Sequence, residues 1–267
     1  MNQYIEAKKL FRDDTDISGY FDSLTFEYAK RELIEAVNSH DTPLIFLLGD
    51  PGVGKSFLMH FLANRVQNAK IAKYFTHPYF EEKELLEALV SLTGPNVEHN
   101  QHSTQALINH LKKHFHDLEY TILIDEAQLL NEQQIELIRI LSDMKLFQFV
   151  LAMHRKEGEF ILQKPHFKSR VTKTIYLESL APDEVGRYIE QRLLSHNLSD
   201  LATQFSKKHI RFIAETAKRN FRTTKKMLAT LFEIMNLAHK GNMPQYERVD
   251  TRTLTMAAID IGLIDVE

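Results

Sequence analysis

The sequence predicts an α/β protein in which helices cover a five-stranded parallel sheet and a smaller all-helical domain follows. Three observations carry this prediction. Short apolar runs rich in β-branched residues alternate with longer stretches of helical periodicity, which is the order typical of a parallel sheet. A glycine-rich motif follows the first of these runs. Beyond Pro182 only helical periodicity remains, with apolar residues three and four positions apart.

Length and composition limit the class of protein. A chain of 267 residues accommodates one large domain, or one domain with a smaller appendage. Its 43% hydrophobic and 26% charged residues are typical of a folded globular protein. The net charge of -3 argues against a polybasic nucleic-acid coat but leaves a local basic patch open. The absence of Cys excludes a disulfide framework, thiolate catalysis and Cys-ligated zinc.

We expect a cytoplasmic protein without a membrane span. The longest apolar runs, such as Leu44–Leu48, are far shorter than the roughly 18 residues that a spanning helix needs. The N-terminal stretch carries acidic residues where a signal peptide would be apolar. The lack of Cys fits a reducing compartment.

The apolar pattern assigns elements along the chain and places one domain boundary. Pro182 favours the first turn of a new helix and disfavours helix in the residue before it, so we divide the chain into domains 1–181 and 182–267. The expected strands are Leu44–Leu48, Ile71–Phe75, Thr121–Ile124, Gln148–Met153 and Thr174–Leu177. The expected helices of the second domain are Asp183–Ser195, Lys207–Arg219, Thr223–Lys240 and Asp250–Ile261.

The motif after the first strand predicts a phosphate-binding loop. Its glycines allow successive N–H groups to point into one concavity, and the following helix directs its positive end there. Lys55 supplies charge for the β and γ phosphates, and the Ser56 hydroxyl is a hard oxygen ligand for Mg²⁺. The alternative is a plain glycine-rich turn with an exposed lysine. The predicted ATP-binding residues here are Gly49, Asp50, Pro51, Gly52, Val53, Gly54, Lys55, Ser56 and Phe57.

Two adjacent carboxylates end the third expected strand. Neighbouring side chains at a strand end point to different faces, so Asp125 and Glu126 can serve different purposes. In a parallel sheet the carboxyl ends of all strands lie at one edge, and the phosphate loop lies at that same edge. We therefore expect Asp125 to bind Mg²⁺ and Glu126 to act as the general base toward the attacking water. The alternative is a pair of acids that merely favour a helix N-terminus.

With these two motifs the sequence resembles the AAA+ class of P-loop NTPases. Within that class it is similar to the bacterial ExeA/GspA/MshM-like group, associated with type II secretion, type IV pili and DNA uptake, with TniB/TnsC-like transposition ATPases as neighbours. The residues that carry the resemblance are GDPGVGKS, ILIDEAQLL with Gln128, EQQIELIRILSDM and LESLAPDEVGRYIEQRLL. The resemblance implies sheet order 5-1-4-3-2, a helical lid domain, and rings or filaments with nucleotide between subunits.

The resemblance also assigns residues outside the two motifs. Arg170 precedes the fifth strand, where an arginine finger acts in a neighbour's site; the alternative is a surface arginine in a basic loop. Arg222 resembles the sensor-2 arginine of the lid; the alternative is a solvated helix start. At the sensor-1 position the chain departs from the Gly-Gln-Pro-Glu of secretion-type relatives, and His154 is the best polar candidate.

Two clusters outside these motifs leave their interpretation open. Between Lys207 and Lys226 eight basic residues stand against one acid, and positions 218, 222 and 225 share a face if the helix is continuous. Such a stripe could follow a DNA backbone, although a solvated lid surface is the alternative that we favour. His110 and His114 have the spacing of a helical metal pair, but no further ligand pattern accompanies them, so we predict no metal site there.

Three hypotheses about function follow. The leading one is a cytosolic, Mg²⁺-dependent AAA+ ATPase that forms homo-oligomers and acts on a protein client in a pilus, secretion or DNA-uptake machine. The second is a DNA-bound ATP switch of the transposition-regulator or replication-initiator kind. The third is a signalling switch that hydrolyses ATP rarely and exchanges partners by conformation.

Overall fold

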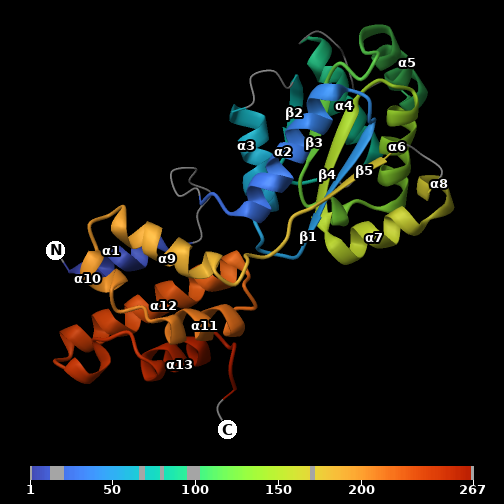
Figure 1. Ribbon diagram of the computed structural model, residues 1–267. Helices are drawn as coiled ribbons and strands as arrows, with labels where there is room; N and C mark the ends of the chain where they lie inside the picture. The colour runs from blue at the N-terminus through green and yellow to red at the C-terminus, as the bar shows by residue number, and fades with distance from the viewer. Residues whose placement is uncertain are drawn as a thin grey trace. The chain divides into compact units, whose positions relative to one another are not determined.

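The computed structural model describes residues 2–12, 21–65, 70–78, 81–94, 103–168 and 172–265. The chain divides into two compact units, shown in Figure 1. A sheet unit contains residues 27–51 and 55–177, and a helical unit contains residues 1–26, 52–54 and 178–267. None of the described helices is long and apolar enough to cross a membrane.

The sheet unit is built on one five-stranded parallel sheet. The strands follow the spatial order β2-β3-β4-β1-β5, which confirms the predicted α/β class and the order 5-1-4-3-2. In the register of the sheet, Leu48 lies between Met153 of β4 and Tyr176 of β5. The strands are β1 (Leu44–Gly49), β2 (Ile71–Phe75), β3 (Thr121–Ile124), β4 (Gln148–His154) and β5 (Thr172–Tyr176).

Helices flank this sheet (Figure 1). Phe46 and Leu48 pack in one apolar core with side chains of α4, α5 and α6. The alternate residues Ile45 and Leu47 are also fully buried, as expected for a parallel sheet that is covered on both faces. The helices are α2 (Leu24–Ser39), α3 (Lys55–Arg65), α4 (Glu82–Val90), α5 (Thr104–His114), α6 (Glu132–Asp143), α7 (Arg155–Gln163) and α8 (Pro165–Lys168).

A buried polar network holds the start of the central strands. Gln148, at the beginning of β4, is fully buried, and its Oε1 accepts a hydrogen bond of 2.9 Å from the Thr121 hydroxyl on β3. Its Nε2 donates to the carbonyl oxygens of Ala36 at 3.0 Å and Thr42 at 2.9 Å. One amide therefore ties α2 and the chain entering β1 to two strands, and satisfies polar groups that burial would otherwise penalise.

The helical unit has its own apolar core. Phe11, which follows α1, stacks on Phe232 of α12 with ring centroids 5.7 Å apart, so the N-terminal helix belongs to this unit. The division into domains 1–181 and 182–267 stays a prediction. The helices are α1 (Gln3–Leu10), α9 (Glu184–Leu194), α10 (Ser199–Ala202), α11 (Lys207–Thr216), α12 (Phe221–Lys240) and α13 (Thr251–Asp260).

The predicted helix Lys207–Arg219 ends earlier than expected. Lys218 and Arg219 adopt positive φ angles of 50° and 58°, which interrupt the helix between α11 and α12. The next helix begins at Phe221, with the Asn220 side chain accepting a hydrogen bond from the Thr223 N–H as its N-cap. Positions 218, 222 and 225 therefore do not lie on one continuous helix, so the condition for their sharing one face is not met.

A buried carboxylate joins two distant parts of the helical unit. Glu184, at the start of α9, is fully buried. Its Oε1 accepts a hydrogen bond of 2.6 Å from the Leu24 N–H, and its Oε2 accepts one of 2.6 Å from the Ala181 N–H. Arg187 of the same helix donates to Oε1 at 3.4 Å. Glu184 thus fixes the first residue of α2 to the beginning of α9.

We expect Glu184→Gln to lower the free energy of unfolding by about 1–3 kcal/mol, because the new amide NH₂ opposes a backbone N–H donor. Urea unfolding followed by circular dichroism measures the change. Glu190→Gln, at an exposed position of α9, is the matched control and should stay within about 0.5 kcal/mol of the original chain. Equal effects of the two substitutions would contradict the role given to Glu184.

Candidate active site

The predicted phosphate loop connects β1 to α3. Two of its glycines have positive φ angles, 82° at Gly52 and 109° at Gly54. A side chain at either position would be strained, because L-residues rarely adopt this region. The loop leads directly into the first turn of α3 at Lys55, so the backbone N–H groups at this helix start are directed to the same place as the loop. This is the local geometry that anion binding requires.

The side chain of Lys55 lies against the loop. It is 8% exposed, and its Nζ donates hydrogen bonds to the carbonyl oxygens of Gly49 at 2.8 Å and Asp50 at 3.1 Å. A plain turn with a solvent-exposed lysine, the alternative from sequence, does not fit this burial. The contact of this ammonium group with a bound phosphate stays a prediction. Of the remaining loop residues, Pro51 is exposed, Val53 is buried and Phe57 is half-buried in α3.

Asp125 lies at the end of β3 and is 4% exposed. Its Oδ1 accepts a hydrogen bond of 2.9 Å from the Glu126 N–H, and the side chain of Ser56 also hydrogen-bonds to this carboxylate. Burial raises the pKa of Asp125, while the hydrogen bonds from Ser56 and the Glu126 N–H act in the opposite direction. The two predicted Mg²⁺ ligands, Ser56 and Asp125, are therefore in direct contact, and both offer the hard oxygen atoms that Mg²⁺ prefers.

Tyr74 is a site residue that the sequence did not indicate. It lies on β2 opposite Leu123 of β3, and its hydroxyl donates to Oδ2 of Asp125 at 3.4 Å. Burial, followed by the charge of Asp125, raises the pKa of Tyr74, so the phenol keeps its proton and remains a donor. Only the register between β2 and β3 brings the two side chains together, and no motif encodes that register.

Glu126 follows in a left-handed conformation, with φ 50° and ψ 33°. Its Oε2 accepts a hydrogen bond from Nε2 of Gln128, and Oε1 of Gln128 accepts one of 3.3 Å from the backbone N–H of His154. Non-glycine residues adopt this conformation only where surrounding contacts hold them, and such positions concentrate at functional sites. Gln128 is thus a connector between the predicted general base and the end of β4.

His154 ends β4 and is the register partner of Gly49, the residue that opens the phosphate loop. It occupies the N-cap position of α7 but makes no side-chain capping hydrogen bond. The structure therefore brings His154 to the same edge of the sheet as Lys55, Asp125 and Glu126. Its role in sensing nucleotide stays a prediction. Arg170 lies outside the described residues, so its role also stays a prediction.

Arg222 lies beside Gly52, and both residues belong to the helical unit. Its backbone N–H donates to the Gly52 carbonyl oxygen at 3.1 Å. A Cβ at Gly52 would lie 2.8 Å from the Arg222 Cβ and 2.7 Å from Oδ1 of Asn220. The start of α12 and the loop glycine are thus in contact, and the role of Arg222 in sensing nucleotide stays a prediction. Lys225, in the same helix, is only 7% exposed, with its Nζ 5.8 Å from the Phe221 ring centroid, so it does not extend a surface stripe.

A protein-family comparison identifies part of the chain. Residues 38–162 match the model of the AAA domain. This segment contains the phosphate loop and the acid pair, and the match identifies the protein as a P-loop ATPase with a region similar to AAA domains. No curated protein matches the chain significantly.

Three solved structures have similar folds. Aeropyrum pernix ORC2, in ADPNP–ADP complexes, is 13% identical with a TM-score of 0.58, covering 94% of this chain and 71% of that one. The Thermotoga maritima RuvB Holliday junction branch migration motor is 18% identical with a TM-score of 0.55, covering 90% and 70%. Drosophila ORC bound to DNA is 13% identical with a TM-score of 0.56, covering 97% and 68%. At these identities the likeness concerns the fold.

We expect Gly52→Ala to weaken ATP binding about tenfold or more. The new Cβ would be strained at positive φ and would press on Asn220 and Arg222, which displaces the loop. Titration with a fluorescent ATP analogue measures the affinity. Gly262→Ala is the matched control, because Gly262 also has a positive φ, 71°, with no atom within 4 Å of the new Cβ. Unchanged affinity in Gly52→Ala would show that the loop tolerates a side chain there.

We expect Gln128→Ala to lower kcat about tenfold while the Kd for ATP changes less than about twofold, because Gln128 orients Glu126 and contacts no loop residue in the described contacts. Steady-state kinetics and nucleotide titration separate the two effects. Gln133→Ala, exposed on α6, serves as the control. A normal kcat in Gln128→Ala, or an equal loss in Gln133→Ala, would remove Gln128 from the site.

Proposed function

We propose that this protein hydrolyses ATP with Mg²⁺, that Glu126 is the general base, and that nucleotide state is transmitted to a macromolecular client through the helical unit. The observation that carries the proposal is the contact between Ser56 and Asp125, with Glu126 adjacent to it. This contact joins the phosphate loop to the acid pair, the two parts that phosphoryl transfer to water requires.

The loop and Lys55 would hold the β and γ phosphates. Backbone N–H groups at the start of α3 point at anionic oxygens, and the lysine adds a full positive charge at short range. A Mg²⁺ ion held by Ser56 and Asp125 would offset the remaining phosphate charge. Tyr74 keeps Asp125 in place by donating to its second oxygen. The predicted ATP and Mg²⁺ sites therefore share Ser56 and the same edge of the sheet.

Glu126 would accept the proton of the attacking water. The water oxygen forms a bond to the γ-phosphorus as the bond to the β,γ-bridging oxygen breaks, which yields ADP and inorganic phosphate. The proton passes from the water to the Glu126 carboxylate, which must be ionised and oriented for this step. Gln128 supplies the orientation, because its donated hydrogen bond occupies one carboxylate oxygen and leaves the other for the water.

Sensing and assembly complete the proposal. Arg222 from the start of α12 and His154 from the end of β4 would respond to the γ-phosphate, as the resemblance to AAA+ ATPases implies. Arg170 would act as an arginine finger in the site of a neighbouring copy, with nucleotide at the interfaces of a ring or filament. An always-charged guanidinium suits that position, since it forms fork-shaped hydrogen bonds to phosphate oxygens.

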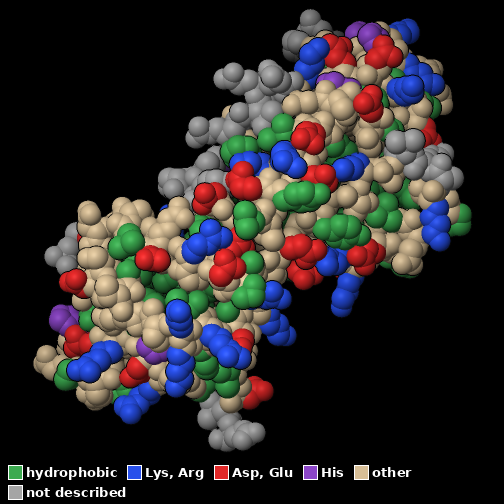
Figure 2. All heavy atoms as spheres, in the orientation of Figure 1, with side chains coloured by type: hydrophobic (Ala, Val, Ile, Leu, Met, Phe, Trp, Pro, Cys, Tyr) green, Lys and Arg blue, Asp and Glu red, His purple; other side chains and the backbone are tan. Residues whose placement is uncertain are grey.

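A protein client in a pilus, secretion or DNA-uptake machine is the leading candidate. It is supported by the ILIDEAQLL and LESLAPDEVGRYIEQRLL segments that resemble the ExeA/GspA/MshM-like group. A DNA-bound ATP switch is the second candidate, since one similar structure is a Holliday junction branch migration motor and another is bound to DNA. Acidic and basic side chains are mixed on the face shown in Figure 2, which gives the second candidate no continuous basic surface there.

We expect Glu126→Gln to bind ATP with nearly unchanged affinity and to lose about 100-fold or more of the Mg²⁺-dependent turnover, since the amide cannot accept the proton of water. Phosphate release measures turnover, and a fluorescent analogue measures binding. Glu157→Gln, an exposed carboxylate in the first turn of α7, should keep full activity. Persistent turnover in Glu126→Gln would refute its assignment as the base.

The same phosphate-release assay distinguishes a protein client from DNA. Turnover is measured at several protein concentrations, with and without single- and double-stranded DNA, over a series of salt concentrations. Turnover that rises with protein concentration and ignores DNA supports shared catalysis and a protein client. Turnover that DNA stimulates, with a steep loss at higher salt, supports the DNA-bound switch.

A further inference from the structure

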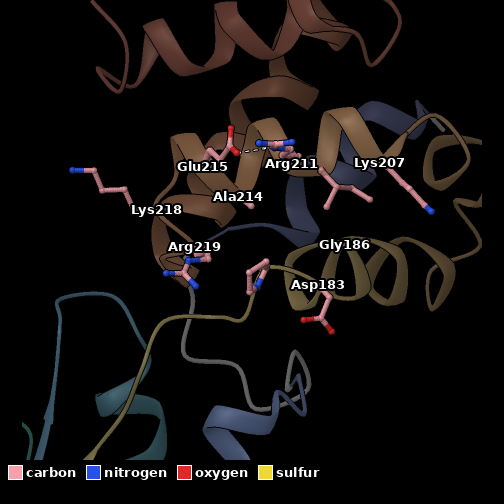
Figure 3. A pocket seen from close by; sticks show the side chains of 10 residues that line it. Asp183, Gly186, Lys207, Arg211, Ala214, Glu215, Lys218 and Arg219 are labelled. Atoms are coloured by element: carbon pink, nitrogen blue, oxygen red, sulfur yellow. Dashed lines mark hydrogen bonds and ion pairs between the residues drawn. The ribbon is translucent and has the colours of Figure 1, made fainter.

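An open groove in the helical unit runs between α11 and the start of α9, with a volume of about 790 Å³ (Figure 3). One whole face of α11 forms its wall, because the lining residues recur at helical spacing. From Lys207 to Glu215 this face spans about 12 Å at 1.5 Å per residue. Its members are Lys207, Ile210, Arg211, Ala214, Glu215 and, just beyond the helix end, Lys218.

The floor of the groove is apolar. Ile210 and Ala214 of α11 face Gly186 and Pro182 of the α9 side. A Cβ at Gly186 would lie 3.0 Å from the Ile210 Cδ1, so the glycine allows the two helices to approach closely at this point. The floor therefore offers apolar contact surface to an incoming side chain, in a recess rather than on a flat surface.

The rim is basic. Its two acids already have cationic neighbours, since Glu215 accepts a hydrogen bond of 2.8 Å from Arg211 and Asp183 lies 3.8 Å from Arg187. Lys207, Lys218 and Arg219 leave the rim with an excess of positive charge. Figure 3 shows Lys207 at one end of the groove and Lys218 at the other. An occupant with negative charge at both ends would match this arrangement.

The backbone that presents Lys218 and Arg219 is unusual. Both residues adopt the left-handed conformation, which is unfavourable for residues other than glycine. A hydrogen bond of 3.1 Å from the Leu180 N–H to the Arg219 carbonyl oxygen holds this turn against the entry to α9. Strain of this kind persists where surrounding contacts fix it and is concentrated at ligand-binding segments. Here it places two cations at one end of the groove.

We propose that this groove binds an acidic amphipathic helix of a partner protein. Apolar side chains of that helix would contact Ile210 and Ala214, and its carboxylates would pair with Lys207 at one end and Lys218 and Arg219 at the other. A DNA backbone would use the cations but not the apolar floor. The proposal goes beyond ATP hydrolysis, because it names the chemistry of a docking segment and requires no turnover.

The test uses the full chain and a synthetic peptide. The probe is a fluorescein-labelled peptide of about 14 residues with Leu at positions i, i+3, i+4 and i+7 and Glu elsewhere, followed by fluorescence anisotropy. We expect saturable binding that weakens with salt. Lys207→Glu/Lys218→Glu should raise the Kd about tenfold or more. Lys208→Glu/Lys240→Glu makes the same charge change at exposed positions that do not line the groove, and should shift the Kd less than about twofold.

Several outcomes would overturn the proposal. These are no saturable binding by the original chain, equal effects of the two double variants, or equal binding of a peptide with the same composition in a non-amphipathic order. Duplex DNA that binds through Lys207 and Lys218 and displaces the peptide would assign the groove to nucleic acid instead. ATP turnover of Lys207→Glu/Lys218→Glu is measured alongside and should be unchanged, so failure of the groove and failure of the ATPase proposal are distinguishable.

Discussion

The three central strands of this parallel sheet are buried and carry polar side chains only at their ends, and the rest of the structure depends on that constraint. At the amino ends of β3 and β4, Thr121 and Gln148 satisfy each other and two carbonyl groups. At the carboxyl ends, the phosphate loop and the acid pair meet. One end is fully satisfied inside the protein, whereas the other has hydrogen-bonding groups directed to a site where a ligand can bind.

Burial of the Asp125 carboxylate is unfavourable, which accounts for the hydrogen bonds that surround it. Burying a carboxylate raises its pKa, and each hydrogen bond donated to it opposes that rise. Ser56, Tyr74 and the Glu126 N–H reach it from three elements, so the backbone of the predicted base itself supplies one of these hydrogen bonds. The geometry of the predicted base is thus linked to the stability of the predicted metal ligand.

The sequence predicted most of the fold because its strands are short apolar runs with clear ends. Ile71–Phe75 and Thr121–Ile124 are confirmed at both ends. The end of α11 was misplaced, since the left-handed turn at Lys218 and Arg219 is held by the Leu180 N–H, far away in sequence. Tyr74 was missed for the same reason: strand register, not a local pattern, brings it to Asp125. Sequence motifs identify site residues that are close together in the chain, whereas site residues that are brought together by tertiary contacts can be found only from the structure.

The packing of α1 on α12 has a consequence for synthesis. Helix α1 emerges from the ribosome before α12, and its partner side chains, such as Phe232, are translated more than 200 residues later, since α12 begins at Phe221. At roughly 5–20 residues per second, Tyr4 and Phe11 would wait on the order of ten seconds or more without their native contacts. The sheet unit can fold in that interval, while the helical unit must close last, around a segment made at the beginning.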